Sequence, residues 1–298
     1  MNRFIWLVRR EIWEHKAIWV APLIVLACLL LAVVTGNVHL GPFGASDPSA
    51  PFGALPQEKQ VKLLLVVYVS LAFVMYLVMG VIGFFYALDS LYADRRDRSV
   101  LFWKSLPLSD AETVLSKFTI AVVVIPLVAL IGSLLAQLIV AGGGSARLAM
   151  SGASGATMWQ HDAIVDAVTA AFVASGTAML WYAPLVAYLM LASAWAPKGP
   201  FLWAVLPPVA LTVLEKVVLG TSHVGDFIGA RIKGPLRLLE SGMQTGANGD
   251  TTLHLSQLDL AGGLRDFYSS PELWLGLVAA GLLLAAAMWV RRYRDDTI

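Results

Sequence analysis

The side chains that could carry chemistry in this sequence are few, and their spacing excludes the common catalytic arrangements. The chain has no G-x-x-x-x-G-K-[ST] phosphate loop, no H-E-x-x-H zinc motif and no G-x-S-x-G nucleophile turn. Its one cysteine, Cys28, cannot form an intramolecular disulfide, and its five histidines lack the spacing of metal ligands. We therefore expect that this chain is not an enzyme and that it binds no metal or cofactor itself.

The densest group of charged side chains, Asp94–Lys117, lies between two long apolar runs. The chain carries 21 basic and 20 acidic residues, and nine of these 41 charges fall within the 24 positions of this segment. Charged side chains are costly inside a membrane, so the segment must face water at a place fixed by the apolar runs on both sides.

A helix, a sharp break and a second helix are predicted within this segment. Trp103 and Leu106 share one helical face, and Pro107 ends that helix. Ser109, followed three residues later by Glu112, forms a capping box that starts a new helix. Exposed aromatic residues beside an amphipathic stripe indicate a surface for a partner protein. Packing against the protein's own first helix stays open as an alternative.

The composition indicates a membrane protein, because 58% of the 298 residues are hydrophobic, 14% are charged and the mean hydropathy is +0.73. We predict one all-α polytopic membrane domain over residues 1–298. Its six transmembrane helices are expected at about 17–38, 63–91, 117–141, 164–196, 200–220 and 272–290. The fifth run is short before charged residues intervene, so whether it spans fully stays open.

The distribution of lysine and arginine predicts that both termini are cytoplasmic. Thirteen of the 21 basic residues then fall on the cytoplasmic side, against six in the opposite loops. The thirteen are Arg3, Arg9, Arg10, Lys16, Arg95, Arg96, Arg98, Lys104, Lys117, Lys198, Arg291, Arg292 and Arg294.

Two amphipathic stretches flank the apolar runs. Before the first run, Phe4, Ile5, Val8 and Ile12 form a stripe that predicts an interfacial helix, with a helix continuous with the first span as the alternative. Between the fifth and sixth runs lies a longer outer segment, residues 221–271, whose first part predicts a short amphipathic helix broken at Gly234–Pro235.

Glu215 and Lys216 are the only charged residues well inside a predicted span. Charges at such positions suggest a function by default. Near the outer interface, however, a lysine can extend its charged end to water. Two interpretations therefore stay open, an outer gate and an interface anchor.

Residues Ala87–Lys117, ALDSLYADRRDRSVLFWKSLPLSDAETVLSK, resemble the signature of type-2 ATP-binding-cassette (ABC) exporter permeases, particularly in DRRDRS, FWKSLP and SD-x-ET. The six-span count, the cytoplasmic termini, the N-terminal amphipathic helix and the long outer segment are similar to that family's pattern over the whole chain.

The resemblance implies that residues 94–116, the coupling segment, form a coupling helix that docks into a separate ATPase subunit, which would bind ATP and Mg. The docking residues it implies are Arg95, Arg96, Arg98, Phe102, Trp103, Lys104, Leu106 and Pro107. It also implies a second permease chain, identical or different, in a bacterial cytoplasmic (inner) membrane, and no nucleic-acid partner.

The nearly apolar spans favour export of a lipid-like or amphipathic substrate. The alternative from another class is a non-transporting membrane scaffold or sensor that docks an ATPase through the same element. An intramembrane enzyme is a weaker third hypothesis, because the spans offer almost no convergent catalytic groups.

Overall fold

The computed structural model describes residues 3–35, 56–97, 109–150, 152, 154–234, 243–245, 251–253 and 260–293. The described chain is nearly all helical, which confirms the predicted all-α membrane fold. One short antiparallel strand pair interrupts it: β1 (Met243–Thr245) pairs with β2 (Thr251–Leu253), with Met243 opposite Leu253. In a membrane, the helix satisfies every backbone hydrogen bond within its own segment, which is why long apolar runs adopt it.

The helices follow the apolar runs in order, with short π-helical and 3₁₀ turns labelled η between them. They are α1 (Arg3–Glu14), α2 (Ala17–Thr35), α3 (Gln57–Arg96), α5 (Asp110–Thr119), η2 (Ile120–Val124), α6 (Ile125–Met150), η3 (Gly155–Trp159), α7 (His161–Trp181), α8 (Ala183–Trp195), α9 (Pro200–Leu214), η4 (Glu215–Leu219), α10 (His223–Lys233), α12 (Leu260–Ser269) and α13 (Pro271–Tyr293).

Within the described ranges, six helical stretches are long and apolar enough to cross a membrane. They are Ala17–Thr35, Gln57–Arg96, Asp110–Met150, Gly155–Trp181, Pro200–Leu219 and Pro271–Tyr293. The fifth, α9 with η4, has 20 residues and is therefore about 30 Å long, the thickness of a bilayer core.

The fourth apolar run, predicted as one span over 164–196, is divided into α7 and α8 at Tyr182. Pro184 lies in the first turn of α8. Its missing amide hydrogen and fixed ring disfavour continuation of α7 and suit the start of a new helix. The first amphipathic stretch is likewise a separate helix, since α1 ends at Glu14 and α2 begins at Ala17.

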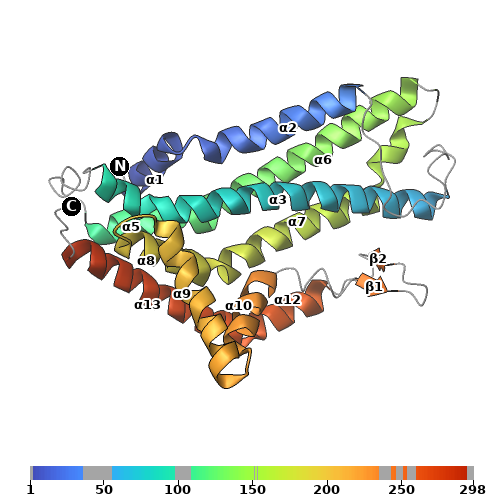
Figure 1. Ribbon diagram of the computed structural model, residues 1–298. Helices are drawn as coiled ribbons and strands as arrows, with labels where there is room; N and C mark the ends of the chain where they lie inside the picture. Colours follow the sequence, from blue (N-terminus) through green and yellow to red (C-terminus); the bar gives the residue numbers. More distant parts are fainter. Residues whose placement is uncertain are drawn as a thin grey trace.

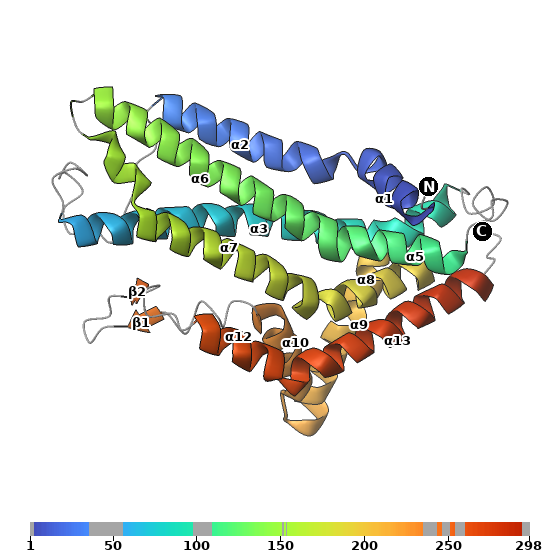
Figure 2. The same cartoon turned by 180° about the vertical axis from the view of Figure 1, so that it is seen from behind.

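The helices form a bundle in which α2, α3, α6 and α7 lie side by side (Figures 1 and 2). α8 and α9 lie against α3, and α13 packs mainly on α8 and α5. One core joins α3, α5, α8 and α13, and a second joins α2, α3, α6 and α7. Four helix ends meet at one end of the bundle: α1, the last turns of α3, the start of α5 and the last turns of α13.

A buried charge network as the candidate functional site

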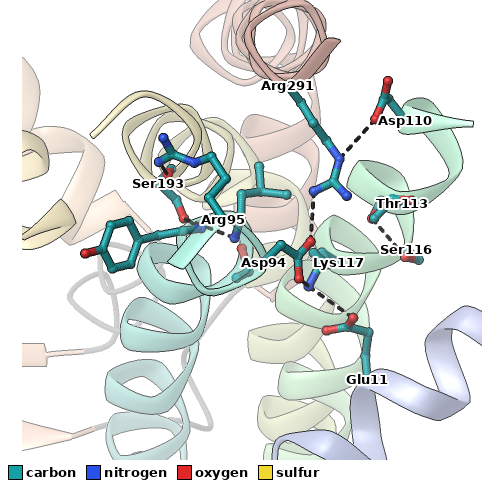
Figure 3. Close-up of polar contacts among 12 residues, drawn as sticks. Glu11, Asp94, Arg95, Asp110, Thr113, Ser116, Lys117, Ser193 and Arg291 are labelled. Carbon is teal, nitrogen blue, oxygen red and sulfur yellow. Dashed lines mark hydrogen bonds and ion pairs between the residues drawn. The ribbon is translucent and has the colours of Figure 1, made fainter. Parts of the chain in front are cut away.

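Five charged side chains from four helices form a connected group where these helix ends meet (Figure 3). We call it the charge network. Its members are Glu11 of α1, Asp94 of α3, Asp110 and Lys117 of α5, and Arg291 of α13.

Acidic and basic groups alternate along the charge network. Lys117 Nζ lies 3.1 Å from Glu11 Oε1 and 3.4 Å from Asp94 Oδ1. Arg291 Nη1 donates to Asp94 Oδ2 at 2.8 Å, and its Nε donates to Asp110 Oδ1 at 3.1 Å. Asp94 therefore bridges the two cations, and one end of α3 is tied to α1, α5 and α13 at once.

The centre of the network is shielded from solvent. The exposed fraction of the side chain is 2% for Glu11, 3% for Lys117, 8% for Asp94 and 7% for Arg291, and rises to 28% only at Asp110. Removing an isolated charge from water costs roughly several kcal/mol. Buried charged groups therefore persist only when each has a partner of opposite sign. The four helix ends are thereby held in one arrangement.

Three more side chains lie around the Glu11 carboxylate. The Tyr86 hydroxyl of α3 donates to Glu11 Oε2 at 3.1 Å, and the His15 ring lies edge-on to the Tyr86 ring, with its Nε2 3.6 Å from the same oxygen. Arg10 Nη2 lies 3.7 Å from Glu11 Oε1.

The local sequence explains why Glu11 points inward. On α1, Leu7 and Glu11 are four residues apart and are both buried, so they share the face that packs on the bundle. Ile5, Trp6 and Trp13 lie on the exposed side of the same helix. An exposed apolar and aromatic face is what an interfacial helix needs, and the predicted stripe is divided between the two faces.

A second set of contacts fixes the last turn of α3 to the end of α8. Arg95 Nη2 donates to the carbonyl oxygens of Ser193 at 2.7 Å and Ala196 at 2.8 Å. The Ser193 hydroxyl oxygen accepts from the amides of Leu91 at 3.1 Å and Tyr92 at 2.9 Å. A cation at the C-terminal carbonyls of a helix is favoured by the helix dipole.

The two predicted docking arginines that the structure describes, Arg95 and Arg96, face in different directions. Arg95 points into the protein, whereas the Arg96 side chain is 53% exposed and lies beside Asp89 and Asp97. The remaining predicted docking residues are outside the described part of the chain: Arg98, Phe102, Trp103, Lys104, Leu106 and Pro107.

The predicted capping box is present at the start of α5. The Ser109 hydroxyl accepts from the Glu112 amide at 3.1 Å, and Glu112 Oε2 accepts from the Ser109 amide at 2.9 Å. The box fixes the first turn of α5, the turn that contains Asp110. It therefore helps to position one end of the charge network.

Glu215 and Lys216 lie in η4, directly after α9, and neither belongs to the charge network. The Glu215 carboxylate accepts from the amides of His223 and Val224, each at 2.7 Å, and from the Thr221 hydroxyl at 2.8 Å. Glu215 thus satisfies free amides at the start of α10, whereas Lys216 is exposed. A gate role for the two residues stays a prediction.

Sequence reasoning missed Ser193 and every member of the charge network as site residues. The sequence presents Lys117 and Arg291 only as basic residues of the predicted cytoplasmic side, and no pattern in it singles out Glu11. No spacing rule connects positions 11, 94, 117 and 291. Within the described ranges, no group of His, Cys, Asp and Glu is placed to hold a metal ion.

The six apolar helices define a multi-pass helical membrane protein. Residues 59–154, about a third of the chain, match the model of the ABC-2 family transporter protein family. The match includes residues 87–117, and it confirms the resemblance to an ABC-2 type permease, the membrane subunit of an ABC transporter. Such a permease works with an ATPase subunit. No match to the chain was found among curated proteins or solved structures.

Proposed function

We propose that this chain is the permease of an ABC exporter and that its coupling segment, residues 94–116, docks into a separate ATPase subunit that binds ATP and Mg. The observation that carries the proposal is that both ends of the segment are anchored by buried polar contacts. Asp94 and Arg95 hold the first end, and Asp110 and Lys117 hold the region where the segment joins α5.

A simple connecting loop does not need such anchors. A segment that receives force does, because flexible ends would absorb the displacement before it reached the spans. Here a displacement of Asp94 pulls on α13 through Arg291 and on α1 through Lys117 and Glu11. Breaking one such buried pair costs about 3–5 kcal/mol, so the four helix ends are expected to move together.

The surrounding surface supports a substrate that enters from lipid. On α9, Leu202, Leu206 and Val213 are all more than half exposed, and the described spans carry few charges. We propose a lipid-like or amphipathic substrate, export as the direction and a dimer of two permease chains. The proposed location is a bacterial inner membrane, with both termini in the cytoplasm.

The first test is association with the ATPase. The tagged chain, purified in mild detergent, is expected to retain an ABC ATPase, and Trp103→Ala or Phe102→Ala is expected to weaken that association or uncouple transport. Ser70→Ala, on the exposed side of α3, is the control. Full ATPase binding and transport by both aromatic variants would exclude docking through these residues, and recovery of no ATPase would refute the proposed function.

The second test separates a transporter from a scaffold or sensor. A transporter is expected to show ATPase activity that rises when amphipathic lipids are added to the purified complex in nanodiscs. ATPase activity that stays constant across lipid classes, with no lipid translocated in proteoliposomes, would favour the scaffold.

A further inference from the structure

A second polar junction lies where α10 meets α7, α8 and α13. The Arg231 guanidinium of α10 stacks over the Trp181 ring at the end of α7, with its carbon 4.5 Å from the ring centroid. Its Nη1 donates to the Glu272 carbonyl of α13 at 3.3 Å. The guanidinium also fills the space beside Gly276 of α13, where a β-carbon would collide with it.

Backbone contacts strengthen this junction. Trp181 Nε1 donates to the Arg231 carbonyl at 2.7 Å, and the Tyr182 hydroxyl donates to the Ile232 carbonyl at 2.9 Å. Burial lowers the pKa of Arg231 from its ordinary value, but an arginine stays charged at neutral pH. A charged guanidinium on an indole face is attracted by the negative face of the ring. The end of α10 is therefore fixed to the α7–α8 break and to the start of α13.

Between this junction and the charge network run α8 and α13, and they pack against each other more extensively than any other two described elements. Their shared core contains many small residues, among them Ala183, Ala187, Ala280 and Ala287. Small side chains let two membrane helices approach closely and interlock. The pair is therefore expected to move as one body.

α13 reaches both polar sites, whereas α8 reaches the Arg231 junction and, at its other end, Arg95, the residue next to Asp94 of the charge network. α8 begins directly after Tyr182 and ends at Trp195, beside the carbonyls of Ser193 and Ala196 that accept from Arg95. α13 begins at Pro271, one residue before the Arg231 contact, and contains Arg291 near its other end. With 23 residues, α13 is about 34 Å long.

We propose that α8 and α13 form a two-helix lever that carries motion of the coupling segment to the outer segment, residues 221–271, with Arg231 and Gly276 as the positioning residues at its far end. The inference rests on the proposed function, because it takes an ATPase as the source of motion. Interlocked cores shift between discrete arrangements rather than deforming continuously, so a displacement at Arg291 arrives at Arg231. The competing route runs through α9 and the Glu215 contacts.

The test follows the outer segment with one spin label. In a Cys28→Ser background, Phe227→Cys places a nitroxide on α10, where the native side chain is 70% exposed. The complex with its co-purified ATPase is compared without nucleotide and with ATP plus vanadate. We expect the label's mobility to change with nucleotide in the otherwise unaltered chain. In Arg231→Gln that nucleotide-dependent change is lost while ATP hydrolysis persists.

Two further variants make the test decisive. Gly276→Ala displaces the Arg231 guanidinium from the α13 side and is expected to abolish the same nucleotide-dependent change in label mobility. Because this variant keeps Arg231, it shows whether the effect of Arg231→Gln comes from the lost contact or from misfolding. Arg265→Gln removes an exposed arginine from α12, in the same outer segment, and is expected to keep the change.

The outcomes separate the two proposals. A nucleotide-dependent change that survives in both Arg231→Gln and Gly276→Ala would overturn the lever and favour the α9 route. A label that never responds, in a complex that hydrolyses ATP, would also overturn the lever but leave the ATPase partnership intact. If no ATPase co-purifies, the proposed function itself fails.

Discussion

Replacing Lys117 by methionine removes one cation from the centre of the charge network and keeps a flexible side chain of similar length. Lys117 Nζ is the shared partner of Glu11 and Asp94, and all three side chains are less than a tenth exposed. Loss of one member of a buried ion pair costs about 3–5 kcal/mol. Because Asp94 keeps Arg291 and Glu11 keeps the Tyr86 hydroxyl, we expect a loss of about 3 kcal/mol, at the lower end of that range.

Lys62→Met is the matched control on α3. Lys62 Nζ lies 2.7 Å from Glu58 Oε1, closer than either distance at Lys117, but the two side chains are 47% and 80% exposed. An exposed pair contributes only about 0.2–1 kcal/mol, because water and salt screen it. The comparison therefore isolates burial from distance.

The assay is equilibrium unfolding of the purified chain by SDS in mixed micelles, followed by helical circular dichroism. If Lys117→Met lowers the free energy of unfolding no more than Lys62→Met does, the burial argument is refuted. Adding Glu11→Gln to Lys117→Met neutralises one stranded carboxylate and is expected to recover part of the lost stability. Failure to recover any would show that the loss does not come from uncompensated charge.

Two further substitutions separate inward-facing from exposed residues. Arg95→Ala removes the donor to the end of α8 and is expected to reduce substrate-stimulated ATPase activity of the complex without releasing the ATPase. Arg96→Ala is expected to weaken ATPase binding in co-purification, because this side chain is exposed. Equal effects of the two variants in both assays would contradict this division. Glu215→Ala is expected to destabilise the start of α10, because the His223 and Val224 amides lose their acceptor. The loss should be seen as faster hydrogen exchange of these two amides, and unchanged exchange would exclude the capping role.

The charge network illustrates how a helical membrane protein can keep ionisable groups out of water. Its members lie at helix ends, where the chain leaves the apolar runs, and each basic group contacts two acidic ones. Such pairs fix relative position more than they add stability, because desolvation offsets much of their attraction. That property suits the transmission of displacement between four helices that we propose for this junction.

Composition and periodicity alone determined the class of fold and the place of the polar segment. Apolar runs of span length must become helices in lipid, because no other local structure satisfies their backbone, and the spacing of Ser109 and Glu112 sets where α5 starts. The motif in residues 87–117 indicates a resemblance to ABC-2 type permeases, and the family match over residues 59–154 confirms that resemblance. These features are local in sequence, so the sequence suffices to find them.

Only the tertiary structure decided which charges meet. Glu11, Asp94, Lys117 and Arg291 come from four helices and are up to 280 residues apart (291 − 11), so their partnership depends on how the helices pack. The same holds for Arg95, which the sequence presents as one of several docking arginines and the fold turns onto α8. Burial then decides the energetic weight of each contact, and burial is a property of the packed bundle rather than of any local pattern.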